Sequence, residues 1–585
     1  MHVSTQRRSY VAGSGEQRVY ETHLLRRTFR EDGKVKHETL ANLSSLPAGA
    51  IDALRRCLKG EALVSADAAG TVLRCLPHGD VAAVMAIAGT LGLPALLGPA
   101  CRQRDLALAL IVSRVVRPAT KLSTLSWWTD TTLGADLGVA GASTDEVYAA
   151  MDWLRSRQEL IEAKLARRHL CDAAANPQRM ALFDLSSSWV EGTHCELAAR
   201  GYSRDGKKGK DQIEYGLLTD PAGRPVAVRV FSGKTGDPTA FIAILAVVRE
   251  QFGLRQMVMV GDRGMITSAR IDAIRALPAK EGFGWLTCLR APQIAALAAD
   301  DGPLQMTLFD QQDLAEITHP DYPGERLVCC RNPLLAAHRS AKRLALLQAT
   351  QDDLAPIVAA VTAGRLHGAA AIGVKVGKVI DRHKMAKHFQ LDITDTTLTV
   401  TRRQATIDAE TAQDGIYIIR TTVAADALDA AAVVRAYKDL SHVERDWRNI
   451  KIDDLALRPI HHYLSGRVQA HILICMLAQY LTWHLRKAWS ELTYTDQRTP
   501  VPNNPVAPAQ RSPQAARKAS RHTDEHDRPV RSFRGLLTHL ATLTRNDIRY
   551  GSDNAAPVVP TLAVPTPTQR RAFELLNTPL PLRLA

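Results

Sequence analysis

The sequence lacks several patterns that would assign it to a familiar class of protein. Its nine cysteines are scattered and contain no C-x-x-C pair, which predicts a reducing compartment and no structural zinc site. The first 17 residues contain no apolar stretch, so we expect no secretory signal. Residues 232–235 resemble the end of a phosphate-binding loop, but that motif requires glycine at the position of Val228. We therefore expect no nucleotide cofactor.

The chain also lacks an uninterrupted apolar run of membrane-spanning character. Residues 81–100 are uncharged and long enough to cross a bilayer. Glycine and proline interrupt this run at Gly89, Gly92, Pro94 and Gly98. We therefore predict two packed helices joined by a turn, and no membrane partner.

Positive charge is in clear excess. Lysine and arginine number 74 against 60 acidic residues, which gives a net charge of +14 and an isoelectric point near 9.4. Such a surplus favours a polyanionic partner such as nucleic acid. The length of 585 residues is too great for one hydrophobic core and predicts three or four domains.

Composition and hydrophobic periodicity divide the chain into six segments. The first is a basic arm with a hairpin signal at Glu31–Lys34. The second has an all-helical pattern, and we expect it to bind DNA ends. A mixed strand and helix region follows, is interrupted by an irregular segment with a basic patch, and then resumes. The last segment is rich in Pro, Asn, Ala, Ser and Arg, and we expect it to be partly disordered. The six segments are 1–50, 51–175, 176–290, 291–412, 413–490 and 491–585.

Two aspartates stand out in the mixed region, where the element order reads βββαβαβ. Short apolar runs predict that Asp184 ends the first strand and that Asp262 ends the fourth. A single aspartate at a strand end is more often a turn former. The two aspartates indicate a catalytic site only in combination with a third carboxylate.

That carboxylate lies on a helix predicted between residues 426 and 451. Tyr437, Glu444 and Lys451 are spaced seven residues apart, so on a regular helix their side chains share one face. Taken alone, this could be a solvated polar stripe. Three carboxylates from two strands and one helix can, however, hold two Mg²⁺ ions, with Mn²⁺ as a substitute, for phosphoryl transfer.

The motifs that carry these residues resemble those of bacterial insertion-sequence transposases of the DDE type, in the IS-four superfamily. The matching stretches are FDLSSSWVEG from Phe183, GYSRDGKKGKDQIEYGLLTDPAGRPVAVRVFSGKTGDP from Gly201, VGDRGM from Val260 and YKDLSHVERDWRNIK from Tyr437. The resemblance covers roughly residues 180–480. It implies an α/β fold whose mixed-sheet core is ribonuclease-H-like, with a β-rich insertion and a mainly α-helical domain before it.

The resemblance also implies an activity. Asp184, Asp262 and Glu444 would be the catalytic and metal-binding triad of a cut-and-paste DNA transposase, an endonuclease that also joins strands. Its partners would be double-stranded transposon ends and target DNA, and it would act as a homodimer on paired ends. Its place would be the bacterial cytoplasm, in association with the nucleoid.

The signature around the glutamate departs from the family at one position. Tyr437 and Lys451 match, and by resemblance they would hold phosphates of the transposon end, but Leu440 stands where the family has arginine. Leucine cannot bond a phosphate, so this contact is lost or comes from elsewhere, such as Arg445 or Arg448. The departure points to the divergent branch often called 1634-like.

A basic loop at residues 200–210 offers further phosphate contacts. It contains five positive residues, one negative residue and three glycines, and its only large apolar residue is Tyr202. We therefore expect an exposed loop that binds DNA. The DNA-binding candidates in it are Arg204, Lys207, Lys208 and Lys210.

Three other functions stay open from the sequence. A ribonuclease-H-like nuclease or resolvase would keep the fold and only hydrolyse DNA. A catalytically silent DNA-binding regulator is disfavoured because all three carboxylates are present. Glycoside hydrolysis by paired carboxylates fits neither the basic surplus nor the lysine predicted on the face of Glu444.

Overall fold

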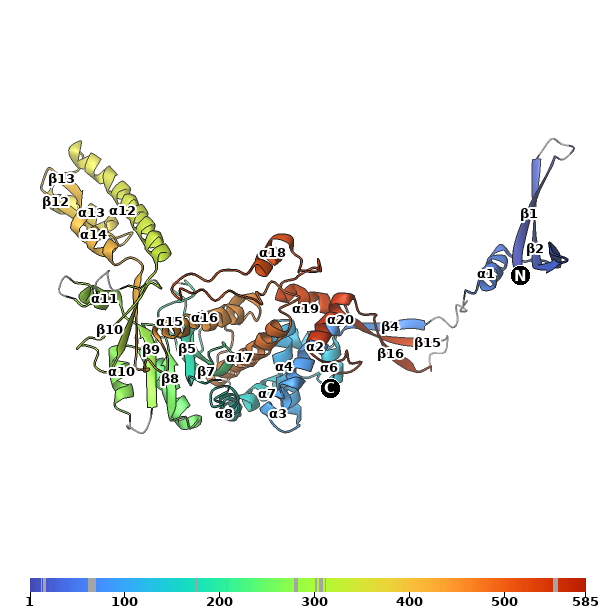
Figure 1. Cartoon of the computed structure of the whole chain (residues 1–585), viewed down its shortest axis with the longest axis horizontal. Coiled ribbons are helices and arrows are strands. Elements are labelled where there is room, and N and C mark those ends of the chain that lie inside the picture. The colour runs from blue at the N-terminus through green and yellow to red at the C-terminus, as the bar shows by residue number, and fades with distance from the viewer. Residues whose placement is uncertain are drawn as a thin grey trace. The chain divides into compact units, whose positions relative to one another are not determined.

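The computed structural model divides the chain into two compact units. One comprises Met1–Cys75 with Arg545–Ala563, and the other comprises Leu76–Thr544 with Val564–Ala585. Figure 1 shows the course of the chain through its elements. None of the helices that the structure describes is both long and apolar enough to cross a membrane. The described residues are 1–11, 13, 17–61, 70–174, 176–207, 209–277, 282–299, 302–304, 309–310, 312–550 and 556–584.

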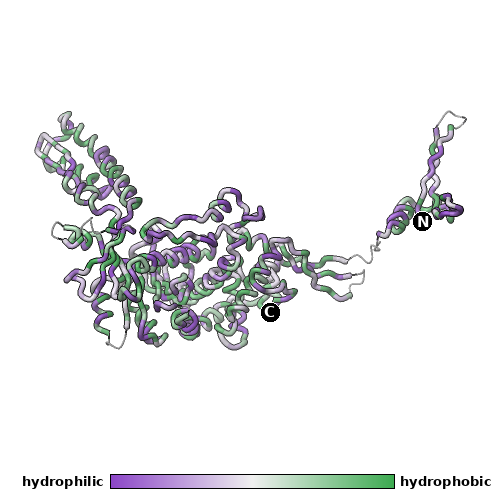
Figure 2. Tube along the Cα trace, in the orientation of Figure 1, coloured by the Kyte–Doolittle hydropathy of each residue, from purple (hydrophilic) through white to green (hydrophobic). Residues whose placement is uncertain are grey.

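The N-terminal segment is a three-stranded antiparallel sheet. Its strands β1 (His2–Val11), β2 (Gln17–Glu31) and β3 (Lys34–Asn42) follow one another in order. Asp32 and Gly33 form the hairpin turn that the sequence predicts, and both have the positive φ that such two-residue turns favour, 50° and 74°. Helix α1 (Ala48–Leu58) packs against β1. Hydrophilic residues are mixed with hydrophobic ones along this sheet (Figure 2).

A second small sheet has the order β16-β15-β4. Its strands are β4 (Gly70–Pro77), β15 (Thr544–Tyr550) and β16 (Val558–Leu562). The predicted helical segment 51–175 therefore includes one strand. The domain that precedes the mixed sheet is not helical throughout.

Helices dominate the chain from residue 79 to residue 169. The run predicted as two packed helices is indeed α2 followed by α3. The long apolar helix α17 (Ser465–Ala488) packs against α2, α4 and α7, and also against strand β7. This contact joins the helical layer to the sheet described next. The helices are α2 (Gly79–Thr90), α3 (Leu93–Leu97), α4 (Arg102–Val116), α5 (Lys121–Trp128), α6 (Thr132–Asp136), α7 (Thr144–Ser156) and α8 (Gln158–His169).

The centre of the larger unit is an eight-stranded mixed sheet with the order β10-β11-β14-β9-β8-β5-β6-β7. Strands β5, β6 and β7 form an antiparallel meander, and β5, β8 and β9 run parallel. The element order βββαβαβ agrees with the sequence prediction. Its strands and helices are β5 (Met180–Trp189), β6 (Gln212–Thr219), β7 (Pro225–Ser232), α9 (Asp237–Ala246), a π-helical turn (Val247–Gln251), β8 (Gln256–Val260), α10 (Ser268–Arg275) and β9 (Gly282–Cys288).

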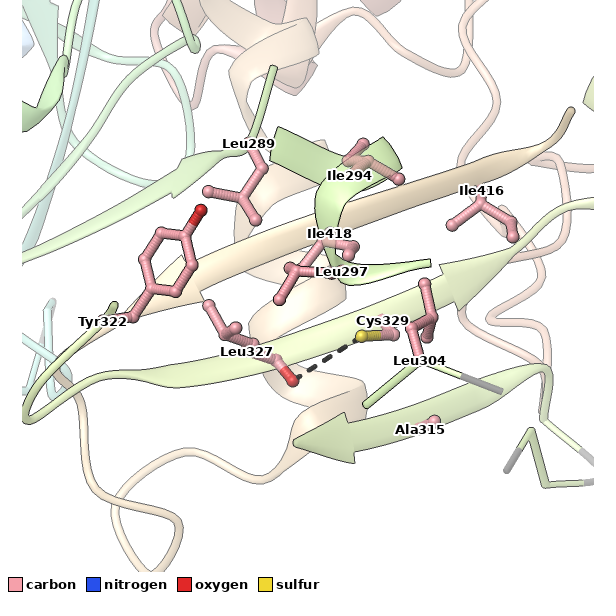
Figure 3. Packing of buried hydrophobic residues seen from close by; sticks show 10 residues of the cluster. All are labelled: Leu289, Ile294, Leu297, Leu304, Ala315, Tyr322, Leu327, Cys329, Ile416 and Ile418. Carbon is pink, nitrogen blue, oxygen red and sulfur yellow. Dashed lines mark hydrogen bonds between the residues drawn. The ribbon is translucent and has the colours of Figure 1, made fainter. Parts of the chain in front are cut away.

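The predicted insertion 291–412 differs from the structure in two ways. Strands β10 (Leu314–Ile317) and β11 (Arg326–Arg331) belong to the main sheet, because β11 pairs with β14 (Ile416–Thr421). Leu327, Cys329, Ile416 and Ile418 from these strands pack beneath helix α11 (Ala291–Leu297) (Figure 3). The inserted part is also helical rather than β-rich. It consists of α12 (Pro333–Thr362), α13 (Ala369–Val379), the hairpin β12 (Phe389–Ile393) and β13 (Leu398–Arg402), and α14 (Gln404–Ala412).

The C-terminal segment, expected to be partly disordered, has defined elements where the structure describes it. They are α18 (Pro513–Arg521), α19 (Phe533–Ala541), β15, β16 and α20 (Pro567–Leu575). Lys518 gives a physical reason for this order, because its buried ammonium donates to the carbonyl oxygens of Ser490, Thr493 and Thr495. The prediction of disorder rested on a composition low in apolar residues, which does not reveal these hydrogen bonds of Lys518.

Candidate functional site

Strand register brings Asp184 and Asp262 together. The parallel pairing of β5 with β8 ends at Leu182 and Val260, and each aspartate lies two residues beyond its paired position. Asp262 follows the end of its strand, as predicted. Asp184 does not end its strand, because β5 continues to Trp189 through antiparallel pairing with β6. The aspartates are nevertheless equivalent positions on neighbouring strands.

The charge around Asp184 is concentrated. Burial of the carboxyl group is the largest cause that raises its pKa to about 7, and the negative charges of Asp262 and Glu444 raise it further. Arg204 acts in the opposite direction but does not cancel these effects. The three carboxylates predicted as a triad are therefore close enough to act on one another electrostatically.

The loop after β8 fixes the orientation of Asp262. Its Oδ1 atom accepts hydrogen bonds from the backbone N–H groups of Gly264 (3.0 Å) and Met265 (2.8 Å). A β-carbon on Gly264 would lie 3.4 Å from Asp262 Oδ1 and 3.5 Å from Asp237 Oδ2. Asp237 is thus a fourth carboxylate beside the triad, which the sequence analysis missed. Its position at the first residue of α9 gave no signal that it faces Asp262.

The helix that carries Glu444 is not regular, which corrects the prediction of a single face. It consists of α15 (Ala430–Lys438), α16 (Leu440–Arg448) and a π-helical turn (Asn449–Asp453). A π-helical turn needs more residues per turn than an α-helix, so a seven-residue spacing no longer aligns side chains across it. α16 packs against β5, and this contact places Glu444 beside Asp184.

Tyr437 and Lys451 consequently lie on opposite sides of Glu444. Tyr437 lines a cavity of about 850 Å³, called here the large cavity. Lys451 lines a cavity of about 360 Å³, called the small cavity. Glu444 is exposed and lines both, so it stands between them.

The large cavity extends from the triad to the first turns of α12. Asp262, Glu444 and Tyr437 line its core side. Burial and the thiol of Cys288 raise the pKa of Tyr437, so its hydroxyl keeps its proton. The cavity also contains Arg263, Arg339, Lys342, Arg343 and Lys438.

Three of those cations are available for an external partner. Arg263, Arg339 and Lys342 are exposed, and their side chains have no ion pair or hydrogen bond with any described residue. Arg343, by contrast, is paired with Asp414 at 2.5 Å, and Lys438 donates to two backbone carbonyl groups. Arg263 directly follows Asp262 in the VGDRGM stretch, a signal that could have identified it, whereas nothing local relates Arg339 and Lys342 to the triad.

Three of the four cations that line the small cavity, Arg204, Lys451 and Arg458, are already paired with carboxylates. Lys451 Nζ lies 2.5 Å from Asp205 Oδ1 and donates to Ser186 Oγ at 3.0 Å. Arg458 pairs with the same Asp205 oxygen at 2.6 Å. Lys451 is buried, and this burial is the main cause that lowers its pKa. The predicted phosphate contact of Lys451 is therefore occupied by an internal carboxylate.

The basic loop is also less free than predicted. Arg204 is ion-paired with Asp237 and lies 3.5 Å from Glu214. Lys210 pairs with Glu191 at 2.9 Å, and Lys207 lies over the ring of Trp189 at 5.3 Å. Lys208 lies outside the described residues. Among the four loop candidates, only Lys207 is described as a cation without an acidic partner.

The side chain of Leu440 makes no polar contact with a described residue, as expected for an apolar group. Leu440 is buried and lines the large cavity near Glu444, so it supplies no phosphate contact. Arg448 is exposed, lines the small cavity, and has no described partner. Of the two substitutes named from the sequence, Arg448 is the one that shares a cavity with Glu444.

The triad does not form a compact metal-chelating group as its side chains lie. Within the part of the chain that the structure describes, no three His, Cys, Asp or Glu side chains are grouped closely enough to hold a metal ion. The donor chemistry still fits a hard cation, because oxygen ligands from carboxylates suit Mg²⁺ and the charges of Asp262 and Glu444 already act on Asp184.

One protein-family model matches the N-terminal part of the chain. Residues 13–69 match the model of the IS1634 family transposase N-terminal domain, which covers β2, β3 and α1. The match supports a transposase of an insertion sequence. More particularly, it supports the IS1634 type, in agreement with the branch that the motif around Glu444 resembles.

One solved structure shows a distant similarity. It is the cryo-EM structure of the piggyBac transposase synaptic complex with hairpin DNA, at 8% identity and a TM-score of 0.32. The similarity covers 65% of this chain and 66% of that chain, just under two thirds of its length. No curated protein matches the sequence.

Proposed function

We propose that this protein is a DDE-type DNA transposase that binds terminal inverted repeats, cuts the DNA there and joins the ends to target DNA. The observation that carries the proposal is the strand register that makes Asp184 and Asp262 neighbours, with α16 adding Glu444. The site opens into a large cavity with three cations that have no partner among the described residues. Carboxylates for metal beside cations for phosphate suit phosphoryl transfer on DNA.

We infer that the core is ribonuclease-H-like. The strand order β7-β6-β5-β8-β9, with three antiparallel strands followed by two parallel ones, supports this inference. The carboxylates lie where the parallel strands end, which is the usual position of ligands in such sheets.

Asp184, Asp262 and Glu444 would hold two Mg²⁺ ions, and Mn²⁺ would substitute. Bound metal would activate the attacking water or 3′-hydroxyl and neutralise charge on the phosphate. The backbone N–H groups of Gly264 and Met265 hold Oδ1 of Asp262, which leaves Oδ2 for a ligand. Arg263, Arg339 and Lys342 would position the DNA backbone in the large cavity. A homodimer on paired ends, acting at the bacterial nucleoid, completes the proposal.

The test is end cleavage by the amide variants Asp184→Asn, Asp262→Asn and Glu444→Gln in Mg²⁺. Each should lose about a thousand-fold in rate, because metal ions contribute several kcal/mol to such transition states. Asp453→Asn is the matched control, since Asp453 is an exposed carboxylate on the same helical segment. Near-normal cleavage by any triad variant would remove that residue from the site.

A second assay separates transposition from hydrolysis alone. A pre-cut end with a free 3′-hydroxyl should give strand-transfer products with a supercoiled target plasmid. Cleavage without such products would identify a nuclease or resolvase instead.

A further inference from the structure

The two faces of the N-terminal sheet differ in charge. In antiparallel strands, directly opposed residues place their side chains on the same face. Thr5 therefore shares a face with His23, to which it is hydrogen-bonded at 2.9 Å. Arg55 of α1 bonds to Thr5 Oγ1, so α1 lies on this side, called here the helix face.

All three carboxylates within the described strands lie on the helix face. Each has a cation beside it on the same face. The pairs are Glu21 with Arg7 at 2.5 Å, Glu31 with Lys36 at 2.6 Å and Glu38 with Arg27 at 3.9 Å.

The opposite side, called the open face, carries arginines and no carboxylate among the described residues. The register places Arg8 opposite Tyr20, Arg26 opposite Thr39, and Arg30 opposite Val35. Arg8 and Arg30 are exposed and have no ion pair or hydrogen bond with a described residue, and Arg26 has only a long one to Thr39 at 3.4 Å.

Hydrogen-bonding side chains occupy most of the rest of the open face. Tyr10 and Tyr20 are 59% and 57% exposed. His37 bonds to Thr28 at 3.0 Å, and its ring lies 6.1 Å from that of His2. Other polar residues of this face are Ser4, Gln6, Thr22 and Asn42.

We propose that the open face of β1–β3 binds double-stranded DNA, with Arg8, Arg26 and Arg30 contacting phosphates. The inference rests on the proposed transposase function and assigns a DNA surface outside the catalytic unit. An acid-free face with three cations and many hydroxyl and amide groups is complementary to the DNA backbone. β1 pairs with residues 17–26 of β2 and β3 pairs with residues 24–31, so most of the sheet is only two strands wide. A two-stranded antiparallel ribbon is narrow enough to enter a major groove.

The experiment compares two triple variants of the full chain that lose the same charge from opposite faces. One is Arg8→Gln with Arg26→Gln and Arg30→Gln, and the control is Arg7→Gln with Arg27→Gln and Lys36→Gln. Binding to a fluorescein-labelled 30-base-pair duplex is measured by anisotropy in EDTA across a KCl series. The slope of log affinity against log salt should fall by about 2.7 in magnitude for the open-face triple, or about 0.9 per contact. For the control triple, the slope should change by less than about 0.9, the value of one phosphate contact.

The outcomes separate this proposal from the proposed function. Equal slopes for the two triples, with normal binding by the unsubstituted chain, overturn the open face alone. Failure of the unsubstituted chain to bind the duplex overturns both. If the open-face triple loses affinity for a single-stranded RNA competitor but not for the duplex, the face is an RNA surface and the proposal is wrong. Should the triple fold poorly, Arg30→Gln alone must lower the slope by about 0.9.

Discussion

The large and small cavities on either side of Glu444 contrast in how their cations are used. In the small cavity, Lys451 and Arg458 both pair with Asp205, and of its four lining cations only Arg448 has no described partner. In the large cavity, Arg263, Arg339 and Lys342 have no described partner. A lysine matched by the family signature is thus engaged internally, whereas Arg339 and Lys342, which lie outside the quoted motifs, have no described partner.

Positive side chains therefore indicate a DNA-binding surface only where they are not already paired with carboxylates of the same chain. The loop at residues 200–210 has five positive residues, yet Arg204 and Lys210 are paired with acids. The N-terminal sheet has cations on both faces: Arg7, Arg27 and Lys36 of the helix face pair with carboxylates, whereas Arg8 and Arg30 of the open face have no ion pair with a described residue. Net charge does not distinguish these cases.

The largest expected effect breaks the pairing in the small cavity. Asp205→Asn leaves Lys451 and Arg458 without a carboxylate in a buried position, and should lower the free energy of unfolding by about 3–5 kcal/mol. Urea denaturation measures this loss. Asp527→Asn is the control, because Asp527 pairs with Arg517 while 79% exposed and should change stability by less than about 1 kcal/mol. Equal effects would show that the Asp205 network is no more than a surface ion pair.

Part of this arrangement could be predicted from the sequence. Short apolar runs ending near Asp184 and Asp262 indicated the strands, and strand order made the two aspartates neighbours. The π-helical turn at Asn449–Asp453 has no signature in the local sequence. The seven-residue spacing therefore suggested that Tyr437 and Lys451 lie on one helical face, whereas they line different cavities. Asp205 and Lys451 are far apart in the chain, and only the tertiary fold reveals that pair.

The next effect concerns Asp80, a buried carboxylate that, unlike Asp205, has no ion pair with a described residue. Burial raises the pKa of Asp80 from 3.8 to about 6. As the pH rises from 3.8 to 6, the unfolded chain ionises first, so stability is lost across this interval and is greatest below it. Asp80→Asn cannot ionise, and it should raise the free energy of unfolding above pH 6 by at most about 3 kcal/mol.

The measurement for Asp80 is denaturant unfolding at pH 3.5 and pH 7.5. Asn keeps the side-chain oxygen that accepts the N–H of Val81 at 2.8 Å, so the two proteins should be equally stable at the lower pH. A variant that is less stable at pH 7.5 would show that the ionised carboxylate is favourably placed.

The smallest expected effect concerns one free cation of the large cavity. Arg339→Gln should lower the salt slope of DNA binding by about 0.9, the value of one phosphate contact. Lys387→Gln is the control within the insertion, because Lys387 already pairs with Glu410 at 2.5 Å. Anisotropy across a salt series compares the two. An unchanged slope for Arg339→Gln would place DNA outside the large cavity.

Binding of Mn²⁺ followed by electron paramagnetic resonance tests the triad most directly, because it needs neither DNA nor activity. The unsubstituted chain should bind two ions, and Asp262→Asn and Glu444→Gln should each weaken binding, while Asp453→Asn should not. Equal Mn²⁺ binding by all four proteins would contradict a metal site formed by Asp184, Asp262 and Glu444.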